Sequence, residues 1–162
     1  SLYLSLGDVT RLPFSDRAFD LFACLETLEH VADDRALLDE ARRVLVPGGR
    51  FICSTPNRSV VSPGKALTDR PINCYHTREY DQGELVHLLE DFFPTVQIFG
   101  QTWFSSRYVE RLNRLGRHLP VVAIRAHQLR KTVGLLWERR ASHAPRSWAG
   151  EEAPEVLIAV CH

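Results

Sequence analysis

Two apolar runs separated by one helical pattern constrain the fold more than any other feature. Residues 19–25 (FDLFACL) and 50–54 (RFICS) are almost continuously apolar, which is typical of strands buried on both faces of a sheet. Apolar residues recur at helical spacing between them, at Leu37, Leu38, Ala41, Val44 and Leu45. A strand, a helix and a second strand in this order predict a βαβ unit with a parallel strand pair.

Capping and breaking residues set the expected limits of the helices. Asp33 or Asp34 can cap the start of the first helix, and residues 47–49 (Pro-Gly-Gly) are expected to end it. Asp81 and Glu84 have the spacing of a capping box, which predicts a second helix containing Leu85, Leu88, Leu89 and Phe92.

The remaining segments are predicted from shorter patterns. Apolar runs predict strands at residues 3–6, 96–99 and 156–161. Residues 55–78 lack periodicity and contain three prolines, so we expect a long loop, which in a compact domain is usually functional. The C-terminal part predicts amphipathic helices at 103–119 and 121–141, followed by a loop at 142–154.

Composition favours a globular chain in a reducing compartment. Hydrophobic residues make up 44% of the 162 residues, and no apolar run is long enough to span a membrane. The N-terminus has no basic region typical of a signal peptide, and the four cysteines form no CxxC pair. We therefore expect free thiols and a cytoplasmic location.

The net charge is zero, but the charges are unevenly spread. Residues 1–100 carry 10 basic and 15 acidic side chains, whereas residues 101–162 carry 10 basic and 5 acidic ones. The basic excess includes a stripe at Arg107, Arg111 and Arg114. An anionic partner and a solvated helical face both explain this asymmetry.

Residues 7–57 carry a series of motifs that occur together in one family. They read GDVTRLPF, then FD, then LETLEHV, and then LLDEARRVLVPGG followed by a strand. In this order and spacing they resemble class I S-adenosylmethionine-dependent methyltransferases of the methyltransferase type 11, or ubiquinone-biosynthesis-like, group. A subset of that family also shows STPN followed by an N-x-[FY]-H-x-x-E-[FY] loop, which residues 73–80 match.

The resemblance implies an α/β fold with a Rossmann-like, doubly wound, mostly parallel sheet and an antiparallel C-terminal strand. The family's first two strands and its Gly-rich cofactor loop have no counterpart here, so we expect an N-terminally truncated fragment with an exposed, association-prone sheet edge. Residues 1–162 then form one partial domain. It consists of a core at 1–101, a basic helical insertion at 102–155 and a last strand at 156–162.

The resemblance also assigns a cofactor site for S-adenosylmethionine. It implies that Asp8 accepts a hydrogen bond from the adenine amino group and that the Val9 amide meets the ring. It places Cys24, Leu25 and Glu26 along the methionine and sulfonium end of the cofactor.

Polar residues outside this set are candidates for chemistry. The resemblance implies catalytic roles for His76, Glu29 and His30, and His76 could act as a general base. Glu26, Glu29 and His30 form an E-x-x-E-H cluster, to which His76 could add a fourth ligand for a divalent metal. Without a metal, LEHV is simply a structural element common to the family. Asn57, Tyr75 and Tyr80 are candidates for substrate binding, although anchoring of the loop explains each equally well.

Three functions follow from these observations. The first is methyl transfer, favoured on oxygen, to a small-molecule, sugar or lipid-linked acceptor. The second is a catalytically inactive truncated remnant. The third is a module that binds a membrane or another anionic partner through the basic helices, with nucleic acid disfavoured. Pairing through the exposed sheet edge would also allow a homodimer.

Overall fold

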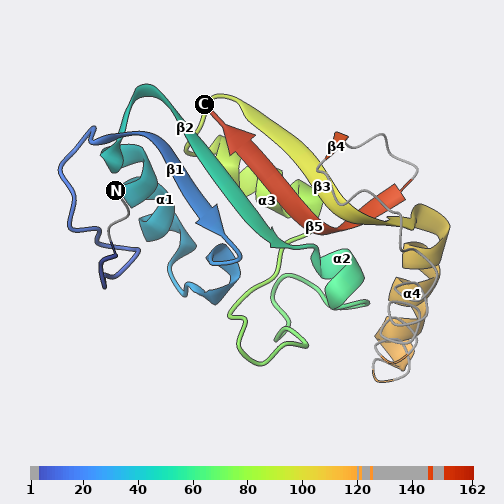
Figure 1. Ribbon diagram of the computed structural model, residues 1–162. Helices are drawn as coiled ribbons and strands as arrows, with labels where there is room; N and C mark the ends of the chain where they lie inside the picture. Colours follow the sequence, from blue (N-terminus) through green and yellow to red (C-terminus); the bar gives the residue numbers. More distant parts are fainter. Residues whose placement is uncertain (1–3, 120, 122–124, 126–145, 148–151) are drawn as a thin grey trace.

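The fold is built on one mixed sheet, which Figure 1 shows in the computed structural model of the chain. The structure describes residues 4–119, 121, 125, 146–147 and 152–162. The strands are β1 (Phe19–Leu25), β2 (Leu45–Pro56), β3 (Val96–Ser105), β4 (Arg146–Ser147) and β5 (Glu152–Cys161), in the order β1-β2-β5-β3-β4. β1 pairs with β2 in parallel, and β5 runs antiparallel to both β2 and β3. This confirms the α/β fold and the reversed C-terminal strand. The described sheet is not mostly parallel as predicted, because only β1 and β2 pair in parallel.

Helices connect the strands, and two of them, α1 (Asp34–Val44) and α3 (Gln82–Glu90), cover one face of the sheet. The other helices are the short α2 (Arg58–Val61) and α4 (Ser106–His118), with a 3-10 turn η1 at Leu28–His30. In Figure 1, α1 and α3 lie behind the strands. Their apolar residues share one core with the sheet, formed by residues such as Leu37, Leu38, Leu85, Leu89, Phe51, Cys53, Leu157 and Ala159. None of the described helices is long and apolar enough to cross a membrane.

The caps of both core helices agree with the prediction. The Asp33 carboxylate accepts a hydrogen bond from the Ala36 amide at 3.0 Å and caps α1. Asp81 and Glu84 form the predicted capping box of α3, with reciprocal side-chain to backbone bonds of 3.0 and 2.8 Å. Each cap pairs amides that would otherwise lack partners in the first turn.

The predicted strand at residues 3–6 is wrong over the part that the structure describes. Residues 4–7 have no regular structure, and the Leu4 and Leu6 side chains are fully exposed. A strand needs a neighbour for its backbone groups, and no described strand pairs with this segment. An isolated bridge between Asp8 and Arg11 is the only pairing nearby among the described residues.

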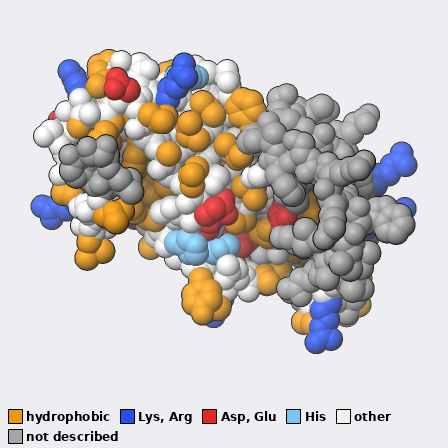
Figure 2. All heavy atoms as spheres, viewed as in Figure 1, with side chains coloured by type: hydrophobic (Ala, Val, Ile, Leu, Met, Phe, Trp, Pro, Cys, Tyr) orange, Lys and Arg blue, Asp and Glu red, His pale blue; other side chains and the backbone are white. Residues whose placement is uncertain are grey.

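β1 lies at the edge of the described sheet, with β2 as its one neighbour among the described strands. Leu21 and Leu25 remain 51% and 59% exposed, which contradicts the prediction that β1 is buried on both faces. Figure 2 shows hydrophobic side chains gathered over the sheet face that α1 and α3 do not cover. An apolar run of this kind therefore predicts a strand, but it does not show whether one face or both faces of that strand are covered.

Three predicted boundaries also differ. Helix α1 ends at Val44, and residues 47–49 lie inside β2, where Gly48 adopts a φ of 78° that suits glycine. β3 continues to Ser105 and pairs with residues 152–154, so α4 starts later than residue 103 and the loop predicted at 142–154 ends earlier. The helix predicted at 121–141 lies outside the described residues.

Candidate functional site

The polar residues singled out by the sequence gather at the carboxyl ends of β1 and β2. Leu25 and Ser54 are paired in the parallel ladder, and Glu26 follows at once. The Ser54 hydroxyl donates to Glu26 Oε1 at 2.7 Å, and the Glu26 amide donates to the Ser54 carbonyl at 3.0 Å. Ligands of open α/β sheets bind at this edge. Glu26 also has a φ of 47°, a left-handed conformation that costs energy in a non-glycine residue.

Glu29, His30 and His76 come together beside this edge. One ligand atom from each of the three lies within 4.8 Å of the other two. The rings of His30 and His76 meet edge to face with centroids 4.9 Å apart. Figure 2 shows histidine and acidic side chains side by side near the middle of the molecular face. Glu26 is not part of this cluster, although the E-x-x-E-H spacing placed it in the predicted metal set.

Glu29 is a buried carboxyl group that also anchors the loop. Its residue is 1% exposed, and burial raises the pKa of its carboxyl group. Thr55 Oγ1 donates to Glu29 Oε2 at 3.2 Å. The Glu29 carbonyl accepts bonds from the Thr77 amide at 2.7 Å and the Thr77 hydroxyl at 2.9 Å. These bonds hold the segment containing His76 against η1.

His76 is bonded on both sides of its ring. Its Nδ1 lies 2.6 Å from Glu79 Oε1, and its Nε2 lies 2.8 Å from Asn73 Nδ2. The His76 and Glu79 side chains are only 10% and 1% exposed. His30 is more exposed, and its Nδ1 lies 2.9 Å from the Tyr75 carbonyl oxygen.

Asp8 and Val9 lie in a turn at the start of the described chain. Asp8 Oδ1 accepts from the Thr10 amide at 2.9 Å and the Thr10 hydroxyl at 2.7 Å. These bonds lower the pKa of the exposed Asp8 carboxyl group, which is therefore an ionised acceptor at neutral pH. Val9 packs against the main core.

A charged pair on α1 fixes the segment that follows Asp8. Glu40 Oε2 accepts from the Leu12 amide at 2.7 Å, and Arg43 donates to the carbonyl oxygens of Leu12 and Phe14 at 3.1 and 2.8 Å. Arg43 also contacts both Glu40 and Asp16 at 2.7 Å. The hydrogen bonds from Arg43 are the main cause that lowers the pKa of Glu40 to about 2.

The other two residues predicted for the cofactor differ in exposure. Cys24 is 6% exposed, and burial raises the pKa of its thiol to about 11. Its side chain faces the core, so only its backbone is available to a ligand at the strand end. Leu25 is 59% exposed beside it.

The predicted substrate residues also separate. Asn57 is 1% exposed, caps α2 through the Ser59 amide and donates to the Pro154 carbonyl at 2.8 Å. Tyr80 is 2% exposed, and its hydroxyl donates to Asp34 Oδ2. Both side chains form hydrogen bonds within the chain, as expected if they anchor the loop and do not bind substrate. Tyr75 is 79% exposed and lies next to the histidine cluster.

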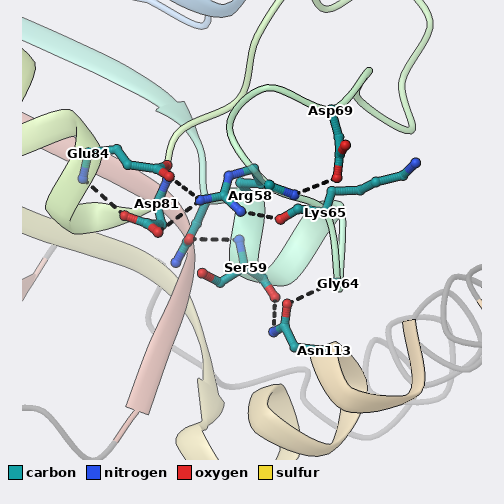
Figure 3. A network of polar contacts seen from close by, with 10 residues as sticks. Arg58, Ser59, Gly64, Lys65, Asp69, Asp81, Glu84 and Asn113 are labelled. Carbon is teal, nitrogen blue, oxygen red and sulfur yellow. Dashed lines mark hydrogen bonds and ion pairs between the residues drawn. The ribbon is translucent and has the colours of Figure 1, made fainter. Parts of the chain in front are cut away.

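A polar network holds the loop after β2 from two sides, as Figure 3 shows. Arg58 contacts both Asp81, at 2.9 Å, and Glu84 at the start of α3. On the other side, Asn113 of α4 accepts from the Gly64 amide at 2.9 Å and donates to the Ser59 carbonyl at 2.6 Å.

The basic residues Arg107, Arg111 and Arg114 lie on the exposed side of α4.

A hollow of about 260 Å³ lies near this network, lined in part by Ser59, Gly83, Val109 and Ala153. Of the predicted site residues it contacts only Asn57, and it contains none of the histidine cluster. The hollow therefore does not mark the same site as the carboxyl edge of β1 and β2.

Sequence reasoning missed Asn73, Glu79, Glu40 and Arg43 as positioning residues. All four lie inside motifs that were recognised as blocks: the first two in the N-x-Y-H-x-x-E-Y loop, and the others three residues apart in the helical LLDEARRVL segment. The i, i+3 spacing of Glu40 and Arg43 was the one signal available for that pair.

The comparisons with known proteins point to one family. The sequence profile described as Methyltransferase domain matches residues 2–53. The chain is 43% identical over 84 residues to a probable S-adenosylmethionine-dependent methyltransferase of Mycolicibacterium smegmatis, a match that covers 52% of this chain and 32% of that protein. It is 48% identical over 44 residues to a ubiquinone biosynthesis O-methyltransferase of Xylella fastidiosa, covering 27% and 18% of the two chains. The chain thus spans about a third or less of these relatives.

Solved structures share the fold. A methyltransferase of Thermotoga maritima, described as a possible histamine N-methyltransferase, superposes with a TM-score of 0.61 at 17% identity, covering 96% of this chain and 60% of that one. A [4+2]-cyclase superposes with a TM-score of 0.52 at 17% identity, covering 98% and 55%. Since a cyclase shares this fold, the fold alone does not assign the reaction.

Proposed function

Because the chain has the sequence motifs and the fold of class I S-adenosylmethionine-dependent methyltransferases, we propose that it takes part in methyl transfer to the oxygen of a small-molecule, sugar or lipid-linked acceptor. One observation carries the proposal. The carboxyl edge of β1 and β2 brings Glu26 and the cluster of Glu29, His30 and His76 to one place. Glu26, Glu29 and His30 lie inside the segment that the methyltransferase profile matches, and Ser54 follows it directly.

The residues present supply part of a site for S-adenosylmethionine. The ionised, exposed Asp8 carboxylate is an acceptor for the adenine amino group, and the Glu40–Arg43 pair holds the turn in which Asp8 lies. The backbone of Cys24 with Leu25 and Glu26 would line the methionine end. The cofactor supplies an already activated methyl group. The protein therefore has to orient the methyl acceptor and take up the proton of its hydroxyl group.

In this proposal His76 takes the acceptor's hydroxyl proton and Tyr75 contacts the acceptor beside it. The burial of His76 and its two ring bonds support a fixed orientation, which a general base requires. Asn57 and Tyr80 keep the surrounding loop and helix in place.

A second candidate within the same chemistry is metal-assisted O-methylation. The three ligand atoms of Glu29, His30 and His76 within 4.8 Å of one another favour it. One carboxylate and two imidazoles suit a divalent first-row ion, which would hold acceptor hydroxyls. The Glu26 carboxylate is bonded to Ser54 and is not required as a ligand.

Isothermal titration with S-adenosylhomocysteine, with and without Mg²⁺ or Mn²⁺, tests the proposal. We expect micromolar binding that weakens in Asp8→Ala, while Asp20→Asn, an exposed change on β1, serves as the matched control. A dependence on the ion that is lost in His30→Gln favours the metal variant. Absence of binding in every condition would favour an inactive remnant, and salt-sensitive binding of anionic vesicles instead would favour the anionic-partner module.

A further inference from the structure

The hydrogen bonds around His76 fix which of its two ring nitrogens carries the proton. The starting point is the Tyr75 amide, which can only donate, and its acceptor is Asn73 Oδ1 at 3.1 Å. The oxygen of the Asn73 amide therefore faces Tyr75. Its nitrogen, Nδ2, is left to face His76 Nε2 at 2.8 Å.

The chain of donors continues through the imidazole. Since Asn73 Nδ2 donates, His76 Nε2 accepts and carries no proton. In the neutral ring the proton is then on Nδ1, which lies 2.6 Å from Glu79 Oε1, an acceptor. A backbone donor at one end and a carboxylate at the other thus require the same tautomer.

Packing and solvation do not favour a carboxylate at the buried position of Glu79. Its side chain is 1% exposed, and Oε2 is buried with no hydrogen-bond partner among the residues that the structure describes. A buried carboxylate with an unsatisfied oxygen costs stability, whereas an apolar side chain of the same size would pack there without that cost. Within the described part of the chain, the one contact that uses its charge is the bond to His76.

We propose that Glu79 is a positioning residue that holds His76 in the Nδ1-protonated form, so that the Nε2 lone pair is presented to the site. The Asn73 amide donates to Nε2 and keeps this nitrogen facing the site. The hydroxyl proton of the methyl acceptor, or a cation, would then replace the amide as the partner of Nε2. The contribution to catalysis rests on the proposed function, but the tautomer does not.

His30 is arranged in the same sense, which supports a common purpose. Its Nδ1 faces the Tyr75 carbonyl oxygen at 2.9 Å, and a carbonyl can only accept, so His30 Nδ1 also carries a proton. A neutral His30 therefore leaves its Nε2 unprotonated. Carboxylate and carbonyl partners on the far nitrogen are the arrangement that prepares an imidazole to give its electron pair to a proton or a metal ion.

Long-range ¹H–¹⁵N correlation spectra of the ¹⁵N-histidine-labelled chain, at a pH where His76 is neutral, read this tautomer directly and need no cofactor. The His76 signals are assigned by their loss in His76→Gln. We expect an Nδ1–H pattern in the wild type, retained in Glu79→Gln, whose amide oxygen can still accept. In Glu79→Leu we expect a mixture of tautomers. Glu90→Gln, an exposed carboxylate on α3, is the control.

An Nε2–H tautomer in the wild type would overturn the proposal, and so would an unchanged pattern in Glu79→Leu. If Glu79→Leu fails to fold, the wild-type spectrum still decides which ring nitrogen carries the proton. If the spectra show the expected tautomer but S-adenosylhomocysteine does not bind, this inference stands and the proposed function is contradicted. If S-adenosylhomocysteine binds but the spectra show the opposite tautomer, the proposed function stands and this inference is contradicted.

Discussion

Ser54 and Glu26 share two hydrogen bonds that involve the serine side chain. The hydroxyl donates to Glu26 Oε1 at 2.7 Å and accepts from the Glu26 amide at 3.1 Å. The second of these bonds, together with the amide's bond to the Ser54 carbonyl, secures the left-handed backbone of Glu26 at the end of β1. The predicted cofactor edge therefore depends on a residue of β2 that sequence reasoning did not select.

Ser54→Ala should loosen this edge. Loss of the two side-chain bonds is expected to cost about 1–2 kcal/mol of unfolding free energy and to weaken S-adenosylhomocysteine binding by about tenfold. Urea denaturation and calorimetric titration measure the two effects. Ser5→Ala, on an exposed residue bonded only to its neighbour, is the control. Unchanged binding in Ser54→Ala would separate this edge from the cofactor site.

Gly116→Ala tests the contact between α4 and the loop after β2. A Cβ at Gly116 would lie 2.1 Å from the Pro63 carbonyl oxygen, and both backbones would have to move. We expect a loss of about 1–3 kcal/mol of unfolding free energy. The matched control is Gly83→Ala in α3, where the nearest atom would be 3.6 Å away, and a gain of about 0.5–1 kcal/mol is expected. Equal effects of the two changes would contradict the close approach.

Thiol reactivity tests the burial of the cysteines. Cys24, Cys53 and Cys161 are buried, and burial raises the pKa of all three thiols, to about 12 for Cys161. Cys74 is exposed. Ellman's reagent at pH 8 should therefore modify Cys74 quickly in the native chain and the other three only after denaturation. Rapid modification of more than one thiol in the native chain would count against this core.

The Glu40–Arg43 pair should make stability depend on acid pH. The folded-state pKa of Glu40, about 2, lies below its ordinary 4.5, so the stabilisation is present above pH 4.5 and is lost as the pH falls toward 2. Melting temperatures recorded between pH 6 and pH 2 should fall less steeply in Glu40→Gln than in the wild type. Parallel curves for the two proteins would show that the pair contributes nothing measurable.

The local features of the fold were predictable, and the non-local ones were not. The βαβ unit, the Asp33 cap and the Asp81–Glu84 capping box depend on residues close in sequence, and all three are present. The failure at residues 4–7 and the exposure of Leu21 depend on which strands lie alongside, and periodicity does not contain that information.

The candidate site shows the same division. The E-x-x-E-H spacing suggested Glu26, Glu29 and His30 on one side of a helix, with His76 added from the loop, but the 3-10 turn η1 brings only Glu29 and His30 to His76. Glu26 instead turns back to Ser54, because it ends β1 in a left-handed conformation. The role of Glu79 became visible only from its burial and its partner.

Hydrogen–deuterium exchange with saturating S-adenosylhomocysteine tests the central claim most directly, because it locates the cofactor along the chain. We predict slower exchange in peptides covering residues 8–14 and 24–30 and no change in α4. Unchanged exchange at both segments, or protection confined to the hollow beside Ser59 and Val109, would contradict the assignment of the carboxyl edge of β1 and β2 as the cofactor site.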